Sequence, residues 1–512
     1  MRTQALSHDQ NSCDGAESIK MHQIQNTATN NQLPYQDPRH CSDSEFVDDD
    51  GRSPKRAGNV RSACVSLTTA IVASPKYMFL PGNVARLGWV AGPAGVIFFS
   101  LLTYCTSALP CACYPSPEVP AKRNHTYMDA IRSNLDGAKY FKICLVIQYL
   151  NLLAAASEYT VFAALMMMHV ARDIKYGLSI NCRNAADACY VNPMPYFMAF
   201  AVAQIILFQI PKFPQLRMSL SILCLMMFLL YSGIGLGLAI AKVAGVHGVY
   251  YADHLALTDS NNTMTRAQKI MKIVQAVGEI ALAYDLSAVL IEIMDTVKSP
   301  PSEAETMKKA TRVSLILTTF VSMLHGCLLY AAFGNNVSPV FLLHGFYKSY
   351  WLLNMIATAA IVLQFAGGYQ IYLLPILAMV EETLAKRFPD NELITKDIKI
   401  PTGCRHFGPY KLNLFRLVWR TLFVITTTAL SMFLPIYLDL LKLFQILAFW
   451  PMAVYFPVEM YIVQKEIPKW SKRWICLQIL SVGSLIGTIA TAAASSVSIG
   501  SNYYNPFKPK YF

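Results

Sequence analysis

Four carboxylates lie inside one mostly apolar stretch, residues 272–302: Glu279, Asp285, Glu292 and Asp295. The stretch is long enough to cross a bilayer as a helix, which takes about 20 residues. A charge near the centre of a membrane costs roughly 3 kcal/mol or more unless it faces a partner or a wet cavity. The carboxylates therefore predict a helix that lines a transport pathway.

The composition indicates a membrane protein. Hydrophobic residues make up 54% of the 512 residues and charged residues only 14%, whereas about a quarter of the residues are charged in soluble domains. The net charge of +12 fits basic loops that face anionic lipid better than a nucleic-acid partner. The sequence contains no motif of a metal site, a nucleophilic hydrolase or a phosphate-binding loop. We therefore expect no enzyme, no metal site and no cofactor.

Long apolar runs predict an all-α polytopic protein with about 11 transmembrane helices. Residues 1–60 are polar and lack the apolar core of a signal peptide, so we expect a disordered cytoplasmic tail. The transmembrane domain then covers residues 61–500, and residues 501–512 form a short extracellular tail. The spans are expected at about 63–84, 88–109, 141–170, 195–210, 218–243, 272–302, 313–333, 350–380, 414–434, 440–463 and 474–497.

Charge bias sets the expected orientation. With the N-terminus inside, the cytoplasmic loops carry the excess of lysine and arginine, as the positive-inside rule requires. An odd number of spans then places the C-terminus outside. The sequons at Asn261 and Asn336 would face outside and the one at Asn124 inside. The outer loop after span 3 contains Cys182 and Cys189, which form a disulfide or remain two free thiols.

Spans 1–5 and 6–10 divide the chain into halves of similar size, and the first span of each half has irregular or charged residues near its centre. Secondary transporters often contain inverted repeats with one broken helix in each. The ends of half-helices bind carboxylates on one side and ammonium groups or cations on the other. The pattern predicts an amino-acid site between spans 1 and 6. The alternative is that Pro75 and Pro81 merely kink a packed helix.

Several blocks of the sequence resemble plant amino acid permeases, which belong to the amino acid/auxin permease family. They include LGWVAGPAG, KRNHTYMDAIRS, GEIALAYDLSAVLIEIMDTVKSPPSE, LNLFRLVWRT and FWPMAVYFPVEMYIVQKEIPKW. The resemblance implies a five-plus-five inverted repeat with broken helices 1 and 6. It also implies proton-coupled symport of amino acids at the plasma membrane, mainly neutral and acidic ones and sometimes basic ones.

The resemblance implies site residues as well. The matching positions are Gly278, Glu279, Ala283 and Tyr284 in span 6, Asn151 in span 3, and Gly368 and Tyr369 in span 8. Tyr284 is the aromatic residue that we expect to contact substrate. Glu279 is the expected proton-coupling group, because the family has an acid there and coupling needs a group that titrates; the alternative is a structural carboxylate.

Span 1 departs from the family, which has a glycine-serine-glycine run where this sequence has Ala73, Ser74 and Pro75. Glycine lets a backbone approach a ligand closely, whereas proline removes a donor. We expect these three residues and Asp285 to contact substrate. Lys76 and Asp285 are both charged where the family is not, and we hypothesise that they form an ion pair at the midplane. The alternatives are two unrelated substitutions or a first span altered by a misjoined exon.

The sequence therefore predicts a monomeric symporter in the lipid bilayer that imports an amino acid together with a proton. The alternative is a transport-deficient paralogue or an amino-acid sensor that keeps the fold but has lost the span 1 site.

Overall fold

We describe the protein from a computed structural model. The residues that it describes are 56, 58–114, 124–135, 138–178, 191–210, 213–245, 265–299, 301–334, 350–389, 391, 394, 397–400, 410–433 and 435–503. Cys182, Cys189, Asn261 and Asn336 lie outside these ranges, as do residues 1–55 and 504–512.

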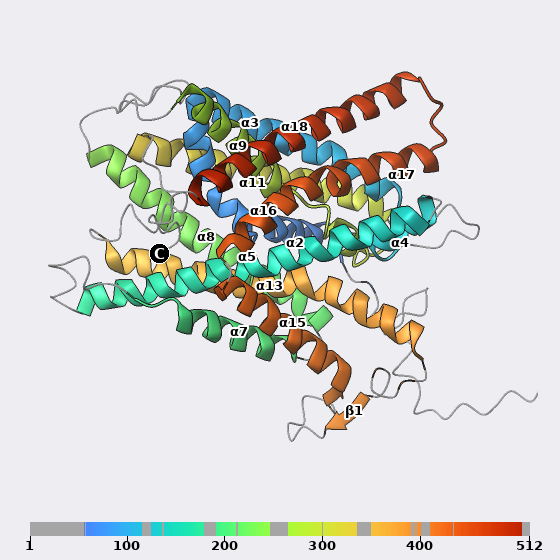
Figure 1. Cartoon of the computed structure of the whole chain (residues 1–512), viewed down its shortest axis with the longest axis horizontal. Helices are drawn as coiled ribbons and strands as arrows, with labels where there is room; N and C mark the ends of the chain where they lie inside the picture. Colours follow the sequence, from blue (N-terminus) through green and yellow to red (C-terminus); the bar gives the residue numbers. More distant parts are fainter. Residues whose placement is uncertain are drawn as a thin grey trace, which may run out of the picture. The chain divides into compact units, whose positions relative to one another are not determined.

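Helices make up most of the described chain (Figure 1). A two-stranded antiparallel ribbon, β1 (Asp397–Ile400) with β2 (Tyr410–Asn413), precedes α15 and is an addition to the predicted all-α bundle. The helices are α2 Val60–Val72, η3 Pro75–Phe79, α3 Leu80–Ala112, α4 Tyr127–Asn134, α5 Ala138–Leu178, α7 Met194–Phe208, α8 Phe213–Gly245, α9 Arg266–Ala283, α10 Leu290–Met294, α11 Glu303–Phe333, α13 Trp351–Arg387, α15 Leu414–Phe433, α16 Pro435–Phe449, η6 Trp450–Tyr455, α17 Phe456–Gln464 and α18 Lys472–Tyr503.

Each of the eleven predicted spans corresponds to a helix or a broken helix. Within the described ranges, eight helices are long and apolar enough to cross a membrane, judged by length and composition. The others are the short apolar helices α2 and α7 and the interrupted pair α9–α10. Several helices are longer than predicted, because their polar ends continue beyond the apolar run. At the two ends, α2 begins at Val60 and α18 continues to Tyr503, slightly outside the expected 61–500.

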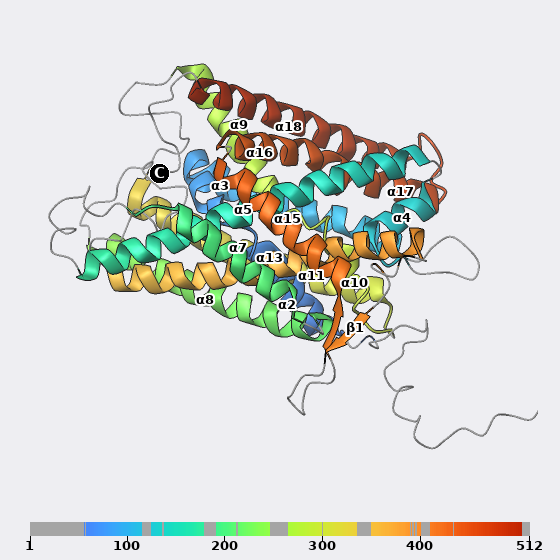
Figure 2. The same cartoon turned by 60° about the horizontal axis from the view of Figure 1, so that its bottom comes forward.

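The helices differ in how far the bundle covers them. In α5 and α13, 83% and 72% of the apolar window is buried, against 22% in α18. The first two are therefore central and α18 is peripheral, as the two views of the bundle also show (Figures 1 and 2). Exposed apolar side chains on the outer helices, such as Phe98, Ile316 and Ile479, form the kind of surface that lipid covers.

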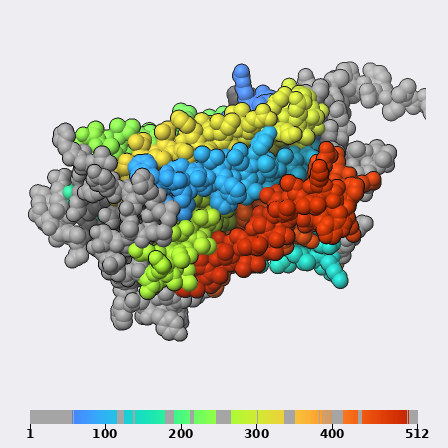
Figure 3. Space-filling model, turned by 90° about the horizontal axis from the view of Figure 1, so that it is seen from above, coloured from blue at the N-terminus to red at the C-terminus, as the bar shows by residue number. Residues whose placement is uncertain are grey.

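Contacts between helices recur in pairs that relate the two halves. Helix α2 packs against α11, and α9 packs against α3; α8 packs against α13, and α16 packs against α5. Figure 3 shows α3 between α11 and the C-terminal helices. Each pair becomes the other when both of its spans are replaced by their counterparts in the other half of the chain, five spans earlier or later. Because five is odd, equivalent helices run in opposite directions, and the bundle is a five-plus-five inverted repeat.

The first span is broken where the sequence predicts. Helix α2 ends at Val72, Ser74 is extended (φ −68°, ψ 134°), and Pro75 begins the 3-10 helix η3. Proline has no N–H and disfavours a helical conformation in the preceding residue, so the α-helical ladder stops. Pro81 and Gly82 do not interrupt the span: they lie in the first turn of α3, where a missing N–H costs nothing.

The chain turns back at Gly88, inside α3. Its φ of 83° lies in the left-handed region that favours glycine. A Cβ added at Gly92 would lie 2.7 Å from the carbonyl oxygen of Val84, whereas residues eight apart in a straight helix are separated by about 12 Å. Residues 80–87 are therefore the second half of span 1, and residues 89–112 are span 2.

The sixth span is broken over residues 284–289. Helix α9 ends at Ala283 and α10 begins at Leu290. Between them, the Asp285 carboxylate accepts the N–H of Ser287 at 2.9 Å, a local bond that competes with the helical ladder. The predicted broken helices 1 and 6 are both confirmed.

Candidate substrate site between the broken helices

Neighbouring spans hold the open end of α2. Gln364 on α13 donates from Nε2 to the Val72 carbonyl at 2.6 Å, which satisfies one of the carbonyls that a helix end leaves free. A Cβ added at Gly368 would lie 3.1 Å from both the Cβ and the carbonyl oxygen of Ala73. Two predicted site residues, Ala73 and Gly368, are therefore in direct contact, and Ser74 continues the chain from this contact into η3.

The open end of α9 is held in the same way. Thr103 on α3 donates to the carbonyl of Tyr284 at 3.2 Å. A cavity of about 20 Å³, room for roughly one water, lies beside this break and is lined by Tyr284, Asp285 and Ser287 together with α3 and α17. Ala283 is buried in the hydrophobic core. The break therefore presents backbone and carboxylate oxygens beside a small space.

Helix α11 joins the two breaks through hydroxyl groups. The hydroxyls of Tyr77 in η3 and Ser322 are hydrogen-bonded at 2.9 Å. The Tyr284 hydroxyl donates to Thr319 at 3.4 Å, and Thr319 donates to Ser100 of α3 at 2.7 Å. Both tyrosines are buried. One face of α11 thus fixes a tyrosine from each broken span.

Glu279, more than one turn before the end of α9, pairs with Arg86 in the second half of span 1. Their charged groups are 3.6 Å apart, with 39% of the Arg86 side chain and 28% of the Glu279 side chain exposed. Gln275 donates to the other carboxylate oxygen at 3.1 Å, and Arg86 donates to Asn83 at 3.3 Å. This solvent-accessible ion pair therefore links the second half of span 1 to the first half of span 6.

The predicted ion pair between Lys76 and Asp285 is not formed. Within the part of the chain that the structure describes, no contact of 4.0 Å or less joins the two charges. Asp285 instead uses Oδ1 for the N–H of Ser287. Both residues lie at the breaks, but the local turn already supplies a donor to the carboxylate.

Two predicted site residues have packing neighbours that the sequence did not indicate. A Cβ added at Gly278 would lie 2.1 Å from Thr491 on α18, so the missing side chain lets α9 and α18 approach closely. The ring of Tyr369 lies 5.7–6.1 Å from three aromatic rings of α5 and α7, those of Tyr159, Phe200 and Phe208. These contacts place both residues in helix packing.

Sequence reasoning missed several polar residues around the breaks. They are Arg86, Ser100, Thr103, Glu158, Thr319, Ser322 and Gln364. A charged residue inside an apolar span is a signal that could have identified Glu158. Serine and threonine are common at contacts between membrane helices, so the hydroxyl residues carry little signal of their own.

The other ends of the two broken spans are joined by backbone pairing. The N–H of Gly58, just before α2, donates to the Thr296 carbonyl at 3.0 Å, and the N–H of Lys298 donates back to Gly58 at 2.9 Å. Asp295 accepts from the Tyr114 hydroxyl at 2.8 Å and lies 2.9 Å from His125 Nδ1. The start of span 1 is thereby fixed to the end of span 6.

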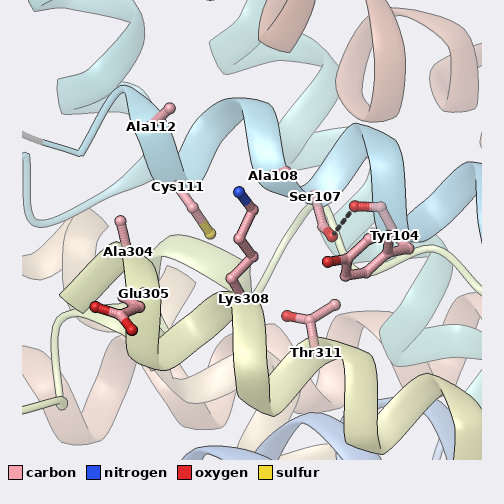
Figure 4. A pocket seen from close by; sticks show the side chains of 9 residues that line it. All are labelled: Tyr104, Ser107, Ala108, Cys111, Ala112, Ala304, Glu305, Lys308 and Thr311. Atoms are coloured by element: carbon pink, nitrogen blue, oxygen red, sulfur yellow. Dashed lines mark hydrogen bonds between the residues drawn. The ribbon is translucent and has the colours of Figure 1, made fainter. Parts of the chain in front are cut away.

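A larger cavity, of about 240 Å³, lies between α3 and α11 at their ends. Tyr104 and Ser107 line it from α3, and Lys308 and Thr311 from α11 (Figure 4). Lys308 extends across it toward α3. Because no predicted site residue lines this cavity, we do not assign the substrate to it.

Comparison with known proteins decides the family. The family model described as transmembrane amino acid transporter protein matches residues 56–499. The chain belongs to this family. Amino acid permease 3 of Arabidopsis thaliana is 48% identical to this transporter over 476 residues, which are 91% of this chain and 96% of the relative. Amino acid permease 2 of the same plant is 44% identical and covers 96% and 97%.

The resemblance to plant amino acid permeases is thereby confirmed, and the transporter moves amino acids across a membrane and is not an enzyme. Among solved structures it is similar to a nucleobase-cation-symport-1 family transporter in a closed conformation, with a TM-score of 0.49, 13% identity and coverage of 88% and 93%. It is also similar to a Na⁺-coupled sialic acid symporter, with a TM-score of 0.41, 13% identity and coverage of 87% and 90%.

Proposed function

We propose that this transporter is a monomeric, proton-coupled symporter that imports neutral and acidic amino acids across the plasma membrane. The main support is that α11 holds both breaks together through Tyr77 and Tyr284. Helices α2 and α9 end at the breaks, so the negative ends of their dipoles lie there, while η3 and α10 begin there. An ammonium group and a carboxylate on one small molecule fit that arrangement.

The direct test is uptake of labelled amino acids by cells that lack their own uptake system, with and without an inward pH gradient. We expect accumulation of neutral and acidic amino acids that disappears when the gradient is removed. Binding without uptake would instead indicate an amino-acid sensor or a transport-deficient relative.

Proton coupling is proposed to act through Glu279. Protonation removes the charge that attracts Arg86, which lies 3.6 Å away, and so weakens the link between one half of span 1 and one half of span 6. An exposed ion pair contributes only about 0–1 kcal/mol to stability. Its loss can therefore shift a conformational equilibrium without unfolding the bundle.

The variant Glu279→Gln is expected to fold normally but to lose the response of uptake to external pH, because the amide cannot take up the proton. Uptake between pH 5 and 8 and protein abundance at the cell surface are the measurements. Glu305→Gln is the matched control, since Glu305 forms an exposed pair with Lys309 far from the breaks. An unchanged pH profile in Glu279→Gln would remove Glu279 from the coupling mechanism.

The proposed orientation, with a cytoplasmic N-terminus, is supported by the sequon at Asn124. The Asn124 side chain is 4% exposed, donates to the Cys113 carbonyl at 3.1 Å and accepts from Ser133 at 2.9 Å. A glycan needs a free amide on an exposed side chain. We expect glycosidase to shift the unaltered protein on a gel and to leave a variant with Asn261→Gln and Asn336→Gln unshifted. A glycan remaining in that variant would overturn the orientation.

A further inference from the structure

Glu158, on α5, is a buried carboxylate that the interactions described so far leave unexplained. Only 4% of it is exposed. Its carboxylate makes no hydrogen bond and no ion pair with any residue in the described ranges. Three other carboxylates of the bundle have partners, in the pairs Asp173–Asn354, Glu279–Arg86 and Glu381–Arg420, whereas one carboxylate oxygen of Glu292 in α10 is also buried without a hydrogen-bond partner.

Glu158 lies at the depth of the break in span 1. The next residue, Tyr159, and Ala73 at the break both lie 3.1 Å from the Cβ position of Gly368. One turn further along α5, Phe162 contacts Phe79 of η3, with ring centroids 5.0 Å apart. Residues four apart lie one above the other on a helix, so Glu158 shares the face of α5 that meets η3.

The broken span 6 places a second carboxylate in the same region. Tyr372 on α13 interacts electrostatically with Asp285 and Glu292 of span 6 as well as with Glu158. Asn151, two turns before Glu158 on the same face of α5, is also buried. The face of α5 that meets η3 thus contains two buried polar residues, Asn151 and Glu158.

The groups around Glu158 do not neutralise it by contact. The titratable residues with described side chains on the elements packed against α5 are Lys76 and Tyr77 in η3, Tyr127, Asp129 and Arg132 on α4, Tyr196 on α7, Tyr369, Tyr372, Glu381 and Arg387 on α13, Arg416 and Arg420 on α15, and Asp439 and Lys442 on α16. Among the described contacts, none of them hydrogen-bonds to Glu158 or forms an ion pair with it. Lys442 directs its ammonium group to the rings of Phe79 and Phe162, 5.2 and 5.7 Å away.

We propose that Glu158 binds the coupling proton at the depth of the breaks. The inference rests on proton-coupled symport as proposed above. A negative charge without a contact partner inside a membrane protein is costly, so the site favours the arrival of a cation. A proton adds to one carboxylate oxygen and gives a neutral acid of the same size, and its departure on the other side restores the carboxylate. Glu279 differs, because it keeps Arg86 as a partner and is 28% exposed, which suits exchange of protons with water.

The test uses the full-length transporter with Glu158→Gln, which mimics the protonated side chain. Two measurements are compared: exchange of labelled for unlabelled amino acid at equal pH on both sides, and accumulation driven by an inward pH gradient. We expect exchange to persist and accumulation to be lost. Ser157→Ala is the matched control, because it removes another buried, unpaired polar group from the same turn of α5 and should leave both activities unchanged.

The outcomes separate this inference from the proposed function. If the unaltered transporter shows no gradient-driven accumulation, proton-coupled symport itself fails. If it accumulates substrate and Glu158→Gln does so equally, only the role of Glu158 fails. Loss confined to amino acids with cationic side chains would also overturn the inference, because Glu158 would then bind substrate. Should Glu158→Gln not reach the membrane, Glu158→Ala removes the titratable group without adding an amide, and gradient-driven accumulation by that variant would count against the proposal.

Discussion

Replacing Glu381 with glutamine is expected to destabilise the transporter by about 3–5 kcal/mol, because a buried positive charge loses its partner. Glu381 on α13 accepts two hydrogen bonds from Arg420 on α15, at 2.8 and 2.9 Å, and one from Arg416 at 3.1 Å. Both Glu381 and Arg420 side chains are 9% exposed. Arg420 also donates to the Phe208 carbonyl at the end of α7, so one ion pair connects three helices.

Thermal unfolding of the purified protein in detergent, together with its abundance in the membrane, measures this effect. Glu305→Gln again serves as the control, since its pair with Lys309 is exposed, and it should behave like the unaltered protein. Adding Arg420→Met to Glu381→Gln should restore much of the lost stability, because an apolar pair often replaces a buried ion pair without cost. Equal unfolding temperatures for the single variant and the unaltered protein would refute the account.

Replacing Gly368 with leucine is expected to lower uptake by about tenfold or more, since overpacking costs about 1–3 kcal/mol and 1.4 kcal/mol is a factor of ten. An added Cβ would already lie 3.1 Å from the Cβ and the carbonyl oxygen of Ala73. The carbonyl is backbone and cannot rotate away as a side-chain end would. The break in span 1 must therefore shift, and with it the contact that Tyr77 makes with α11.

Uptake at saturating and at low substrate concentration, normalised to surface protein, gives the effect on maximal rate and on affinity separately. Gly233→Leu on α8 is the matched control, because a Cβ there would meet no atom within 4 Å. It should transport normally. Normal transport by Gly368→Leu would mean that the contact between α13 and the first break does not support the site.

The course of the chain through the membrane could be predicted from local sequence. Apolar runs gave all eleven spans, because a membrane helix satisfies its backbone within its own segment and needs only length and hydropathy. Pro75 fixed the break in span 1 for an equally local reason, the missing N–H. Gly88 was correctly taken as the start of span 2, but its role as a reversal point appears only from its backbone angles.

The partners of the charged residues could not be predicted in this way. Lys76 and Asp285 share the region of the breaks and still do not pair, because Asp285 accepts the N–H of Ser287 two residues on. Glu279 forms an ion pair with Arg86. In the sequence, Arg86 is a charged residue near the end of a helix, and nothing in its position indicates this partner.

The sequence by itself determined that this protein is a helical membrane transporter, where its helices lie, and which two of them are interrupted. Those properties depend on hydropathy and on backbone chemistry within a few residues. Only the tertiary structure decided that Gly278 serves packing against α18, that α11 fixes both breaks, and that Glu158 is buried without a contact partner. Each of these depends on residues in different helices, whose approach is set by the way the whole bundle packs.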